Sequence, residues 1–519
     1  MLFVFSVSLS ERAIILPKKK KRNQIRFRHG YGLGDLEKAV AENDDLLAQY
    51  YFNRPRYVSR ALNRDDNSSV FIGPKGVGKS AILQMVRLDQ NSCGNASRVL
   101  EITPDDLAFN ALVNIDARSP LLESAHQNMW LFKSLWDYVL CSELLRREAP
   151  YPGGLESLLA GLFDSRYSRE KKKLLELTLS DDGSPTSMTA KMLGLVSEIE
   201  VKASVNNSSL GGRVSLNDSS EAESDHLKIL QLISNVASDI DRALSHDYYI
   251  LIDDLDHHWK GTELQNAFLG AMFESIWKLS RSRKIKFVVS LRKHIYREVF
   301  IGERDKFKEF VKEVTWSKNS VKEIVQKRLC SVVVINEGRV WEDLFYESAF
   351  NAIWDSTEGT PREVLALTAA CVASAIENDH SSVTPEDLRT ACCSFSEDLL
   401  DGLYNSIKYE YPGVRFVIDR FAGGRKQFDI DYLQEIAFAV SDAIESGLYN
   451  DEIPWVTVGV DNPIQFAQTL LRIGFLRLKA GRDADARAAT DHDILLLNES
   501  DWYSVSPRYQ AGLQLEGTG

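Results

Sequence analysis

Residues 73–80 of this chain read Gly-Pro-Lys-Gly-Val-Gly-Lys-Ser and match the pattern G-x-x-x-x-G-K-[ST] at every fixed position. Glycines such as Gly76 and Gly78 permit backbone angles at which successive N–H groups point at phosphate oxygens. Lys79 is a compact cation that can reach a β- or γ-phosphate, and the Ser80 hydroxyl can ligate Mg²⁺. The pattern therefore predicts a nucleoside triphosphate site. The residues predicted to contact the nucleotide are Gly73, Gly76, Val77, Gly78, Lys79, Ser80 and Ala81.

The residues on either side of this motif support the interpretation. The apolar run 70–72 predicts a buried strand before it, and the largely apolar run 81–86 predicts a helix after it. The unpaired amide groups and the dipole at the start of such a helix favour an anion there. A glycine-rich turn that only joins a strand to a helix is the alternative, and the complete motif argues against it.

A second motif carries three carboxylates. Residues 248–252 form a continuous aromatic and aliphatic run, typical of a parallel strand buried on both faces, and Asp253, Asp254 and Asp256 follow it. We expect Asp253 to bind Mg²⁺ together with Ser80, and Asp254 to orient or deprotonate an attacking water. Asp256 is a reserve candidate for the role of Asp254. A strand that merely ends in an acidic turn is the alternative reading of the same residues.

Five predicted strands must position these groups. They are residues 70–73, 111–116, 248–253, 285–292 and 311–316, and they alternate with helical stretches, which predicts a parallel sheet with helices on both faces. Ligands bind at the carboxyl ends of the strands of such sheets. Ser290 and Arg292 lie at such an end, where they could sense the γ-phosphate or stabilise charge in the transition state. Arg292 could instead form a structural ion pair.

Further segments surround this core. Lys79 and Asp253 are 174 residues apart, so an insertion lies between them, with helices predicted over 121–180 and a polar-tipped hairpin over 181–225. Residues 320–404 are predicted helical, with a helix start at Thr384. The last part predicts two helices and a two-stranded wing, as in a winged-helix domain. Its few basic residues leave protein docking, autoinhibitory packing and DNA binding open.

The order of these motifs resembles the AAA+ and STAND branches of P-loop ATPases, including prokaryotic origin-recognition-like and KAP-type ATPases. The resemblance covers residues 31–400 approximately, and only its two nucleotide motifs are highly specific. It implies that residues 290–292 are the first sensor, and that residues 359–362, Gly-Thr-Pro-Arg, open a lid helix whose Arg362 is the second sensor and contacts nucleotide. A lid-surface arginine is the alternative for Arg362.

The chain departs from this family pattern at two points. Typical AAA+ enzymes carry Asp-Glu at the end of the acidic strand, whereas this chain has Asp253 and Asp254, which makes slow hydrolysis or a switch-like cycle plausible. No arginine is an unambiguous finger for a neighbouring subunit. Arg297 and Arg304 lie in the right region of the sequence, and both could equally be surface charges.

The predicted fold class is α/β, with a five-stranded parallel P-loop NTPase core, a helical insertion, a helical lid and a C-terminal winged-helix-like domain. The predicted domains are a basic tail (1–30), the ATPase core (31–319, with the insertion at about 121–245), the lid (320–404) and the winged-helix-like domain (405–519).

Composition narrows the class of protein. The 519 residues are 44% hydrophobic and 26% charged, as in ordinary soluble proteins, and no apolar run reaches the roughly 18 to 20 residues of a membrane span. Residues 1–30 hold eight basic residues and one acid, a net charge of +7, which leaves −19 for the rest of the −12 chain. The acidic body argues against a broad nucleic-acid face. The six cysteines lack disulfide or metal spacing, which favours the cytoplasm.

Two weaker patterns have simpler explanations. Glu200-Val201-Lys202 matches the acid-x-lysine element of metal-dependent nucleases, but alternating charge on the wet face of a hairpin gives the same pattern. His257-His258 resembles part of a zinc site, but without a third spaced ligand a loop beside the nucleotide is the simpler interpretation.

The sequence therefore predicts a cytoplasmic ATPase that uses ATP and Mg²⁺ to drive conformational switching or assembly. By resemblance we expect a homo-oligomer that works with a protein partner, away from membranes, in a bacterial regulatory or anti-phage defence system. One alternative is a DNA-acting ATPase of the loader, repair or mobile-element type. A second alternative is a nucleotide-gated nuclease effector.

Overall fold

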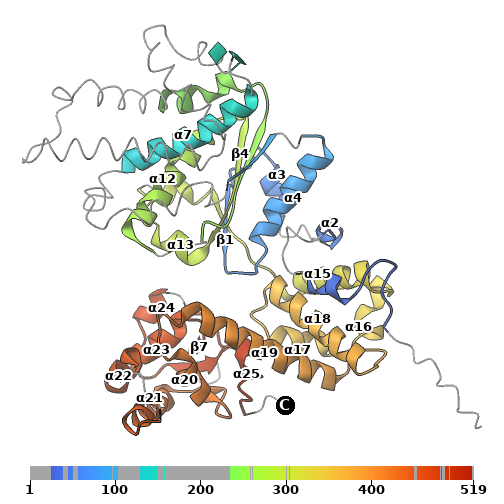
Figure 1. Ribbon diagram of the computed structural model, residues 1–519, viewed down its shortest axis with the longest axis vertical. Coiled ribbons are helices and arrows are strands. Elements are labelled where there is room, and N and C mark those ends of the chain that lie inside the picture. Colours follow the sequence, from blue (N-terminus) through green and yellow to red (C-terminus); the bar gives the residue numbers. More distant parts are fainter. Residues whose placement is uncertain are drawn as a thin grey trace, which may run out of the picture. The chain divides into compact units, whose positions relative to one another are not determined.

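The structure is a computed structural model that describes most of the chain (Figure 1). The described residues are 25–38, 45–50, 56–95, 98–102, 129–149, 153–154, 156–157, 234–256, 259, 261–299, 301–302, 304–448, 453–479, 481, 485–489 and 491–516. The chain divides into two compact units. The core unit holds residues 38–324 and 360–362, and the C-terminal unit holds residues 1–37, 325–359 and 363–519.

The core unit is built on a five-stranded sheet in which every neighbouring pair is parallel. Its strands are β1 (Val70–Gly73), β2 (Val99–Ile102), β3 (Tyr248–Ile252), β4 (Ile285–Arg292) and β5 (Val311–Glu313), in the order β2-β3-β4-β1-β5. The predicted five-stranded parallel core is confirmed. Because β4 lies between β1 and β3, its carboxyl end lies between the ends of the two motif-bearing strands.

One strand of the sheet, at its β3 edge, was not predicted from the sequence. The sequence predicted a strand over 111–116, which lies outside the described residues, whereas the edge position beside β3 is taken by β2. That strand is short, and its third residue, Glu101, is exposed. A four-residue run with a charge inside it gives little sequence signal. The last strand also ends earlier than predicted, at Glu313.

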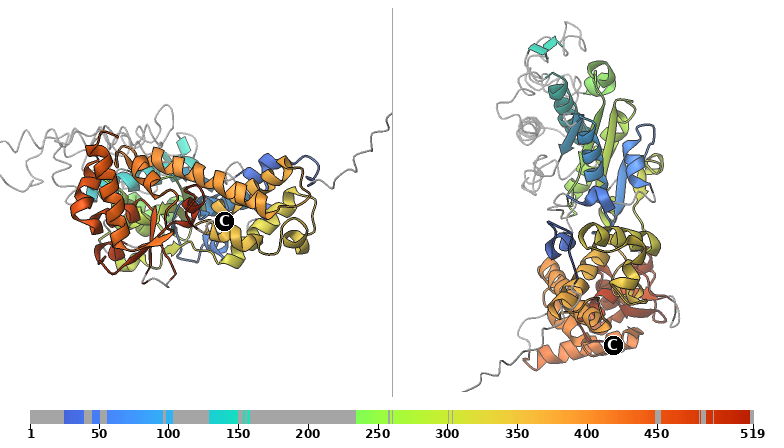
Figure 2. Two further views of the ribbon diagram at one scale, coloured as in Figure 1. Left: turned by 90° about the horizontal axis from the view of Figure 1, so that it is seen from below. Right: turned by 90° about the vertical axis from the view of Figure 1, so that its right-hand side faces the viewer.

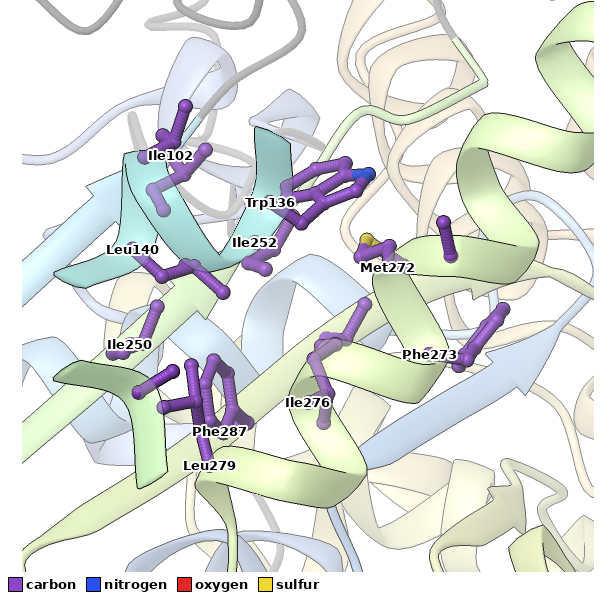
Figure 3. Packing of buried hydrophobic residues seen from close by; sticks show 14 of the residues in the cluster. Ile102, Trp136, Leu140, Ile250, Ile252, Met272, Phe273, Ile276, Leu279 and Phe287 are labelled. Atoms are coloured by element: carbon purple, nitrogen blue, oxygen red, sulfur yellow. The ribbon is translucent and has the colours of Figure 1, made fainter. Parts of the chain in front are cut away.

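Helices cover both faces of the sheet, so successive strand residues pack against different layers. Ile250 and Ile252 of β3 and Phe287 of β4 face α7 (Met129–Glu148) and α12 (Glu263–Leu279), as Figure 3 shows. In this layer the Trp136 indole donates a hydrogen bond to the Phe268 carbonyl at 2.9 Å. The layer fixes the length and register of β3 and β4, and with them the position of the residues that follow.

The opposite face packs against α3 (Tyr57–Leu62) and α4 (Lys79–Ser92), which lie across the sheet from α7 and α12 (Figure 1, Figure 2). Leu251 of β3, Val288 of β4 and Phe71 of β1 point into this second layer. Continuing the two-residue alternation, Asp253, Ser290 and Arg292 fall on the α4 side of the sheet. Short helices in the described part of this unit include α2 (Leu47–Tyr50), α13 (Lys293–Glu298) and α14 (Arg304–Phe307).

The C-terminal unit begins with helices. Its first helix is α1 (Leu33–Glu37). The chain returns to this unit within α15 (Lys318–Val332), at Val325. The helices that follow are η4 (Glu337–Arg339), α16 (Val340–Asp343), α17 (Ala349–Asp355), α18 (Pro361–Glu377) and α19 (Pro385–Ile407). The predicted start of α19 is confirmed. Thr384 caps it, and the buried Asp387 carboxylate accepts hydrogen bonds from the Thr384 amide at 2.9 Å and hydroxyl at 2.7 Å.

The last part of this unit has the predicted winged-helix-like arrangement with one strand more than expected. Strands β7 (Leu476–Lys479) and β8 (Trp502–Val505) form the antiparallel wing, and β6 (Gln427–Phe428) adds to the other edge of β8. The helices are α20 (Val414–Ile418), η5 (Asp419–Phe421), α21 (Ile430–Glu445), α22 (Pro454–Asp461), α23 (Pro463–Arg472), α24 (Asp491–Leu495) and α25 (Pro507–Gln510). Among the described residues, no helix has both the length and the apolar character of a membrane span.

Candidate functional site

The glycine-rich loop joins the end of β1 to the start of α4. Gly76 and Gly78 have positive φ angles of 83° and 93°, as predicted for backbone that points its amides inward. A Cβ at Gly76 would lie 3.1 Å from the Cβ of Arg362, so a side chain there would also meet a neighbour. Gly78 is the N-cap of α4, and a glycine offers no side chain to occupy the first amides of the helix. The loop therefore presents an open helix N-terminus that suits an anion.

Lys79 is the first residue of α4, and its ammonium group lies back over the loop. Its Nζ donates to the carbonyl oxygens of Gly73 at 3.2 Å and Pro74 at 2.9 Å. Burial lowers the pKa of Lys79 below its ordinary value, opposed by the carboxylates of Asp256 and Asp253. The cations of Arg292 and Arg362 lower this pKa further. These five groups, Lys79, Asp253, Asp256, Arg292 and Arg362, form what we call the loop cluster.

The three predicted carboxylates differ in their surroundings. Asp253 is half-buried directly after β3, and its Oδ1 accepts a hydrogen bond from the Asp254 amide at 2.9 Å. Asp254 is exposed and has a φ of 56°, a left-handed conformation that costs energy for any residue with a side chain. Asp256 is half-buried and forms an ion pair with Arg292 Nε. Asp254 is therefore the most solvent-accessible of the three carboxylates.

Strand register brings Ser290 and Arg292 to the same end of the sheet. Arg292 lies beside Gly73, the first residue of the loop, and Ser290 lies beside Phe71. The Ser290 side chain is buried, whereas 35% of the Arg292 side chain is exposed. The structure thus places Arg292 between the glycine-rich loop and the acidic segment after β3. Its partner Asp256 shows that the ion pair considered for Arg292 from sequence exists.

Residues 360–362, which belong to the core unit, contact the loop. The Arg362 amide donates a hydrogen bond to the Gly76 carbonyl at 3.3 Å, and Thr360 Oγ1 lies 3.3 Å from the position of a Cβ on Gly76. On the other side, Trp316 Nε1 donates to the Val77 carbonyl at 2.7 Å. Sequence reasoning missed Thr360 and Trp316. The position of Trp316 just beyond β5, which pairs with β1, was the available signal.

Other predicted candidates lie elsewhere or outside the described residues. Arg304 donates to the carbonyls of Tyr296, Arg297 and Val299, so it stabilises the end of α13. Arg297 is exposed in the last turn of that helix. Glu200–Lys202 and His257–His258 are outside the described part of the chain, within which no group of three or more His, Cys, Asp or Glu residues is arranged to hold a metal.

One family model matches part of this chain. Residues 319–404 are similar to the FunZ-associated C-terminal helical domain. The matched segment begins with α15 and ends inside α19, so it lies mostly in the C-terminal unit. No curated protein matches the sequence.

Solved structures of origin-recognition proteins resemble this chain weakly. The Aeropyrum pernix ORC1 protein in complex with DNA is 12% identical, with a TM-score of 0.41 over 92% of this chain and 96% of that one. The Aeropyrum pernix ORC2 protein (ADPNP–ADP complexes) is 10% identical, with a TM-score of 0.37 over 92% and 98%. Cdc6p from Pyrobaculum aerophilum is 10% identical, with a TM-score of 0.34 over 93% and 96%. These values are too low to transfer function.

Proposed function

We propose that this chain is a P-loop ATPase that binds Mg–ATP at the glycine-rich loop and couples binding and hydrolysis to conformational switching or assembly. One observation carries the proposal: the open helix N-terminus at Gly78, the Lys79 ammonium and the Asp253 carboxylate converge on the same end of one parallel sheet. This is where α/β proteins of this kind bind their ligands.

The proposed binding roles follow from the chemistry of each group. Lys79 exchanges its two carbonyl partners for phosphate oxygens, while the loop amides and the start of α4, including Val77 and Ala81, hold the phosphates. The Ser80 hydroxyl and the Asp253 carboxylate offer the hard oxygen ligands that Mg²⁺ prefers, so these residues fit the metal. When bound, Mg²⁺ would neutralise charge on the phosphates.

The proposed catalytic roles belong to Asp254, Ser290 and Arg292. Asp254 is exposed beside Asp253, and its carboxylate would orient or deprotonate a water molecule. Arg292 and Ser290 lie at the end of β4 and would sense or stabilise the γ-phosphate, and Arg362 would contact it from the segment on Gly76. An aspartate in place of the usual glutamate reaches less far, which is consistent with slow turnover.

The wider setting is proposed from the family resemblance of the motifs. We propose a cytoplasmic AAA+ or STAND-like homo-oligomer that acts with a protein partner in a bacterial regulatory or anti-phage defence system. A DNA-acting ATPase is the alternative, but cations of the wing are engaged within the chain. Arg487 forms a bidentate pair with Asp493 at 2.6 and 2.8 Å, and Arg477 pairs with Glu358. The nuclease alternative depends on Glu200, where Glu200→Ala should abolish any cleavage.

Replacing Lys79 tests nucleotide binding directly. Lys79→Ala should weaken ATP binding by more than about 100-fold, because charge-assisted bonds to the phosphates are lost together. Isothermal titration calorimetry with ATP and Mg²⁺ measures the affinity. Lys75→Ala is the matched control, since Lys75 is an exposed lysine of the same loop, and it should stay within a few-fold of the unchanged protein. No binding of ATP by the unchanged chain would refute the proposal.

Replacing Asp254 separates binding from hydrolysis. Asp254→Asn should lower the rate of phosphate release by about 100-fold or more, the usual contribution of a general base, while ATP affinity changes little. Single-turnover phosphate release at saturating ATP measures this. If turnover survives in Asp254→Asn but is lost in Asp256→Asn, the reserve candidate Asp256 takes the role instead.

A further inference from the structure

Asp256 and Arg292 form an ion pair that has no role in the ATPase cycle proposed above. Arg292 ends β4 beside Gly73, and Asp256 lies three residues after Asp253, so the pair spans the gap between the two motifs. The side chains are 23% and 35% exposed, so a ligand can reach them. Burial lowers the pKa of Lys79, and the carboxylate of Asp256 opposes that shift. The Asp256 carboxylate therefore lies among the cations that would receive the phosphates.

The charges of the loop cluster are unbalanced. The charges of Asp253, Asp256, Arg292 and Arg362 act on Lys79, so these five groups carry one positive charge in excess. One oxygen of Asp253 already accepts from the Asp254 amide, and Asp253 is the proposed Mg²⁺ ligand. Asp256 is thus the carboxylate that engages Arg292. A γ-phosphate would offer Arg292 more charge and more acceptor oxygens than one carboxylate does.

We propose that Asp256 is a positioning residue that holds Arg292 in the nucleotide-free protein, and that the γ-phosphate of ATP displaces Asp256 from Arg292. This inference rests on the proposed ATP site. ADP lacks the γ-phosphate, so it would leave the pair intact. The exchange of partners at Arg292 would then set how strongly the site prefers ATP to ADP, and would give the protein two distinct states for the two nucleotides.

The test is a double-mutant cycle on the ratio of ATP to ADP affinity. A non-hydrolysable ATP analogue and ADP are titrated into the unchanged protein, Asp256→Asn, Arg292→Ala and the double variant. Asp256→Asn should raise the ratio about tenfold, because the analogue no longer has to break a charged pair. Arg292→Ala should lower the ratio. In the Arg292→Ala background, Asp256→Asn should leave the ratio unchanged within about twofold.

The ratio of ATP to ADP affinity, compared with and without Arg292, distinguishes an exchange of partners at Arg292 from a general effect of charge. An equal rise in the affinity for both nucleotides, with the ratio unchanged, would overturn the proposal. A general charge effect of removing the Asp256 carboxylate would favour the more highly charged ATP equally with and without Arg292. An equal change of the ratio with and without Arg292 would overturn the proposal too. Asp305→Asn is the matched control, because Asp305 forms an exposed pair with Lys308 at 2.6 Å elsewhere in the same unit. If the unchanged protein binds neither nucleotide, the proposed function fails first. Thermal unfolding verifies that each variant is folded.

Discussion

Two clusters of cations and carboxylates, one in each unit, differ in their balance of charge and in the number of hydrogen bonds that hold them. The loop cluster of the core unit holds three cations and two carboxylates, and the Asp256–Arg292 pair is partly exposed. In the C-terminal unit, Glu358 and Glu363 face Arg477 and Arg508, a set we call the Glu358 cluster. There the charges balance, and the exposed fractions of these four side chains lie between 13% and 23%.

Hydrogen bonds also distinguish the Glu358 cluster from the loop cluster. Glu358 accepts from Arg477 and from the Ser506 hydroxyl, and Glu363 accepts from Arg508 at 3.1 Å and from the Glu358 amide at 2.7 Å. These bonds join the turn before α18 to β7 and to the segment after β8. A balanced set of partners from distant segments stabilises one arrangement, whereas an unbalanced set beside an open helix end is suited to an incoming anion.

Removing the central carboxylate of the Glu358 cluster should have the largest effect on stability. In Glu358→Ala, the mostly buried cations of Arg477 and Arg508 lose the negative charge of Glu358. This loss should lower the free energy of unfolding of the C-terminal unit by about 2 kcal/mol. Urea denaturation measures this. Glu386→Ala removes an exposed pair with Arg389 and should leave the free energy of unfolding almost unchanged. Equal costs for the two variants would contradict the comparison.

Ionisation of Glu358 in this cluster should make the stability of the C-terminal unit depend on pH. Burial raises the pKa of Glu358, but the charges of Arg477 and Arg508 and the bonds from Arg477 and Ser506 outweigh it, so this pKa lies below its ordinary value. The ionised group therefore contributes fully above the unfolded pKa of about 4.3, and its contribution is lost as the pH falls below that value. The stability difference between the unchanged protein and Glu358→Gln should be constant from about pH 6 to 8 and narrow towards pH 3.

Asp256 should contribute little to stability. Asp256→Asn should change the free energy of unfolding of the core unit by less than about 1 kcal/mol, because its pair with Arg292 is partly solvated. Denaturation without nucleotide gives the value. A loss as large as that of Glu358→Ala would mean that both clusters are structural, and the distinction drawn between them would be wrong.

Local chemistry determined much of the fold and of the candidate site from the sequence alone. The glycines at 76 and 78 require backbone angles that other residues avoid, so the loop could be located without any tertiary information. Continuous apolar runs identified β1 and β3, because strands of a buried parallel sheet are apolar on both faces. The cap of α19 followed from Thr384 and Pro385, since capping is a matter of a few neighbouring residues.

Tertiary structure alone decided which charges meet. Glu358 and Arg477 are 119 residues apart in the chain, and no local pattern pairs them. The sequence allowed Arg292 either a phosphate contact or a structural ion pair. In the structure, the register of β4 against β1 brings Arg292 beside Gly73, and Arg292 forms an ion pair with Asp256. The left-handed backbone at Asp254 was likewise invisible, because an aspartate adopts that conformation only where its surroundings compensate the strain. Spacing along the chain fixes local conformation, whereas long-range packing selects the partner of each charged group.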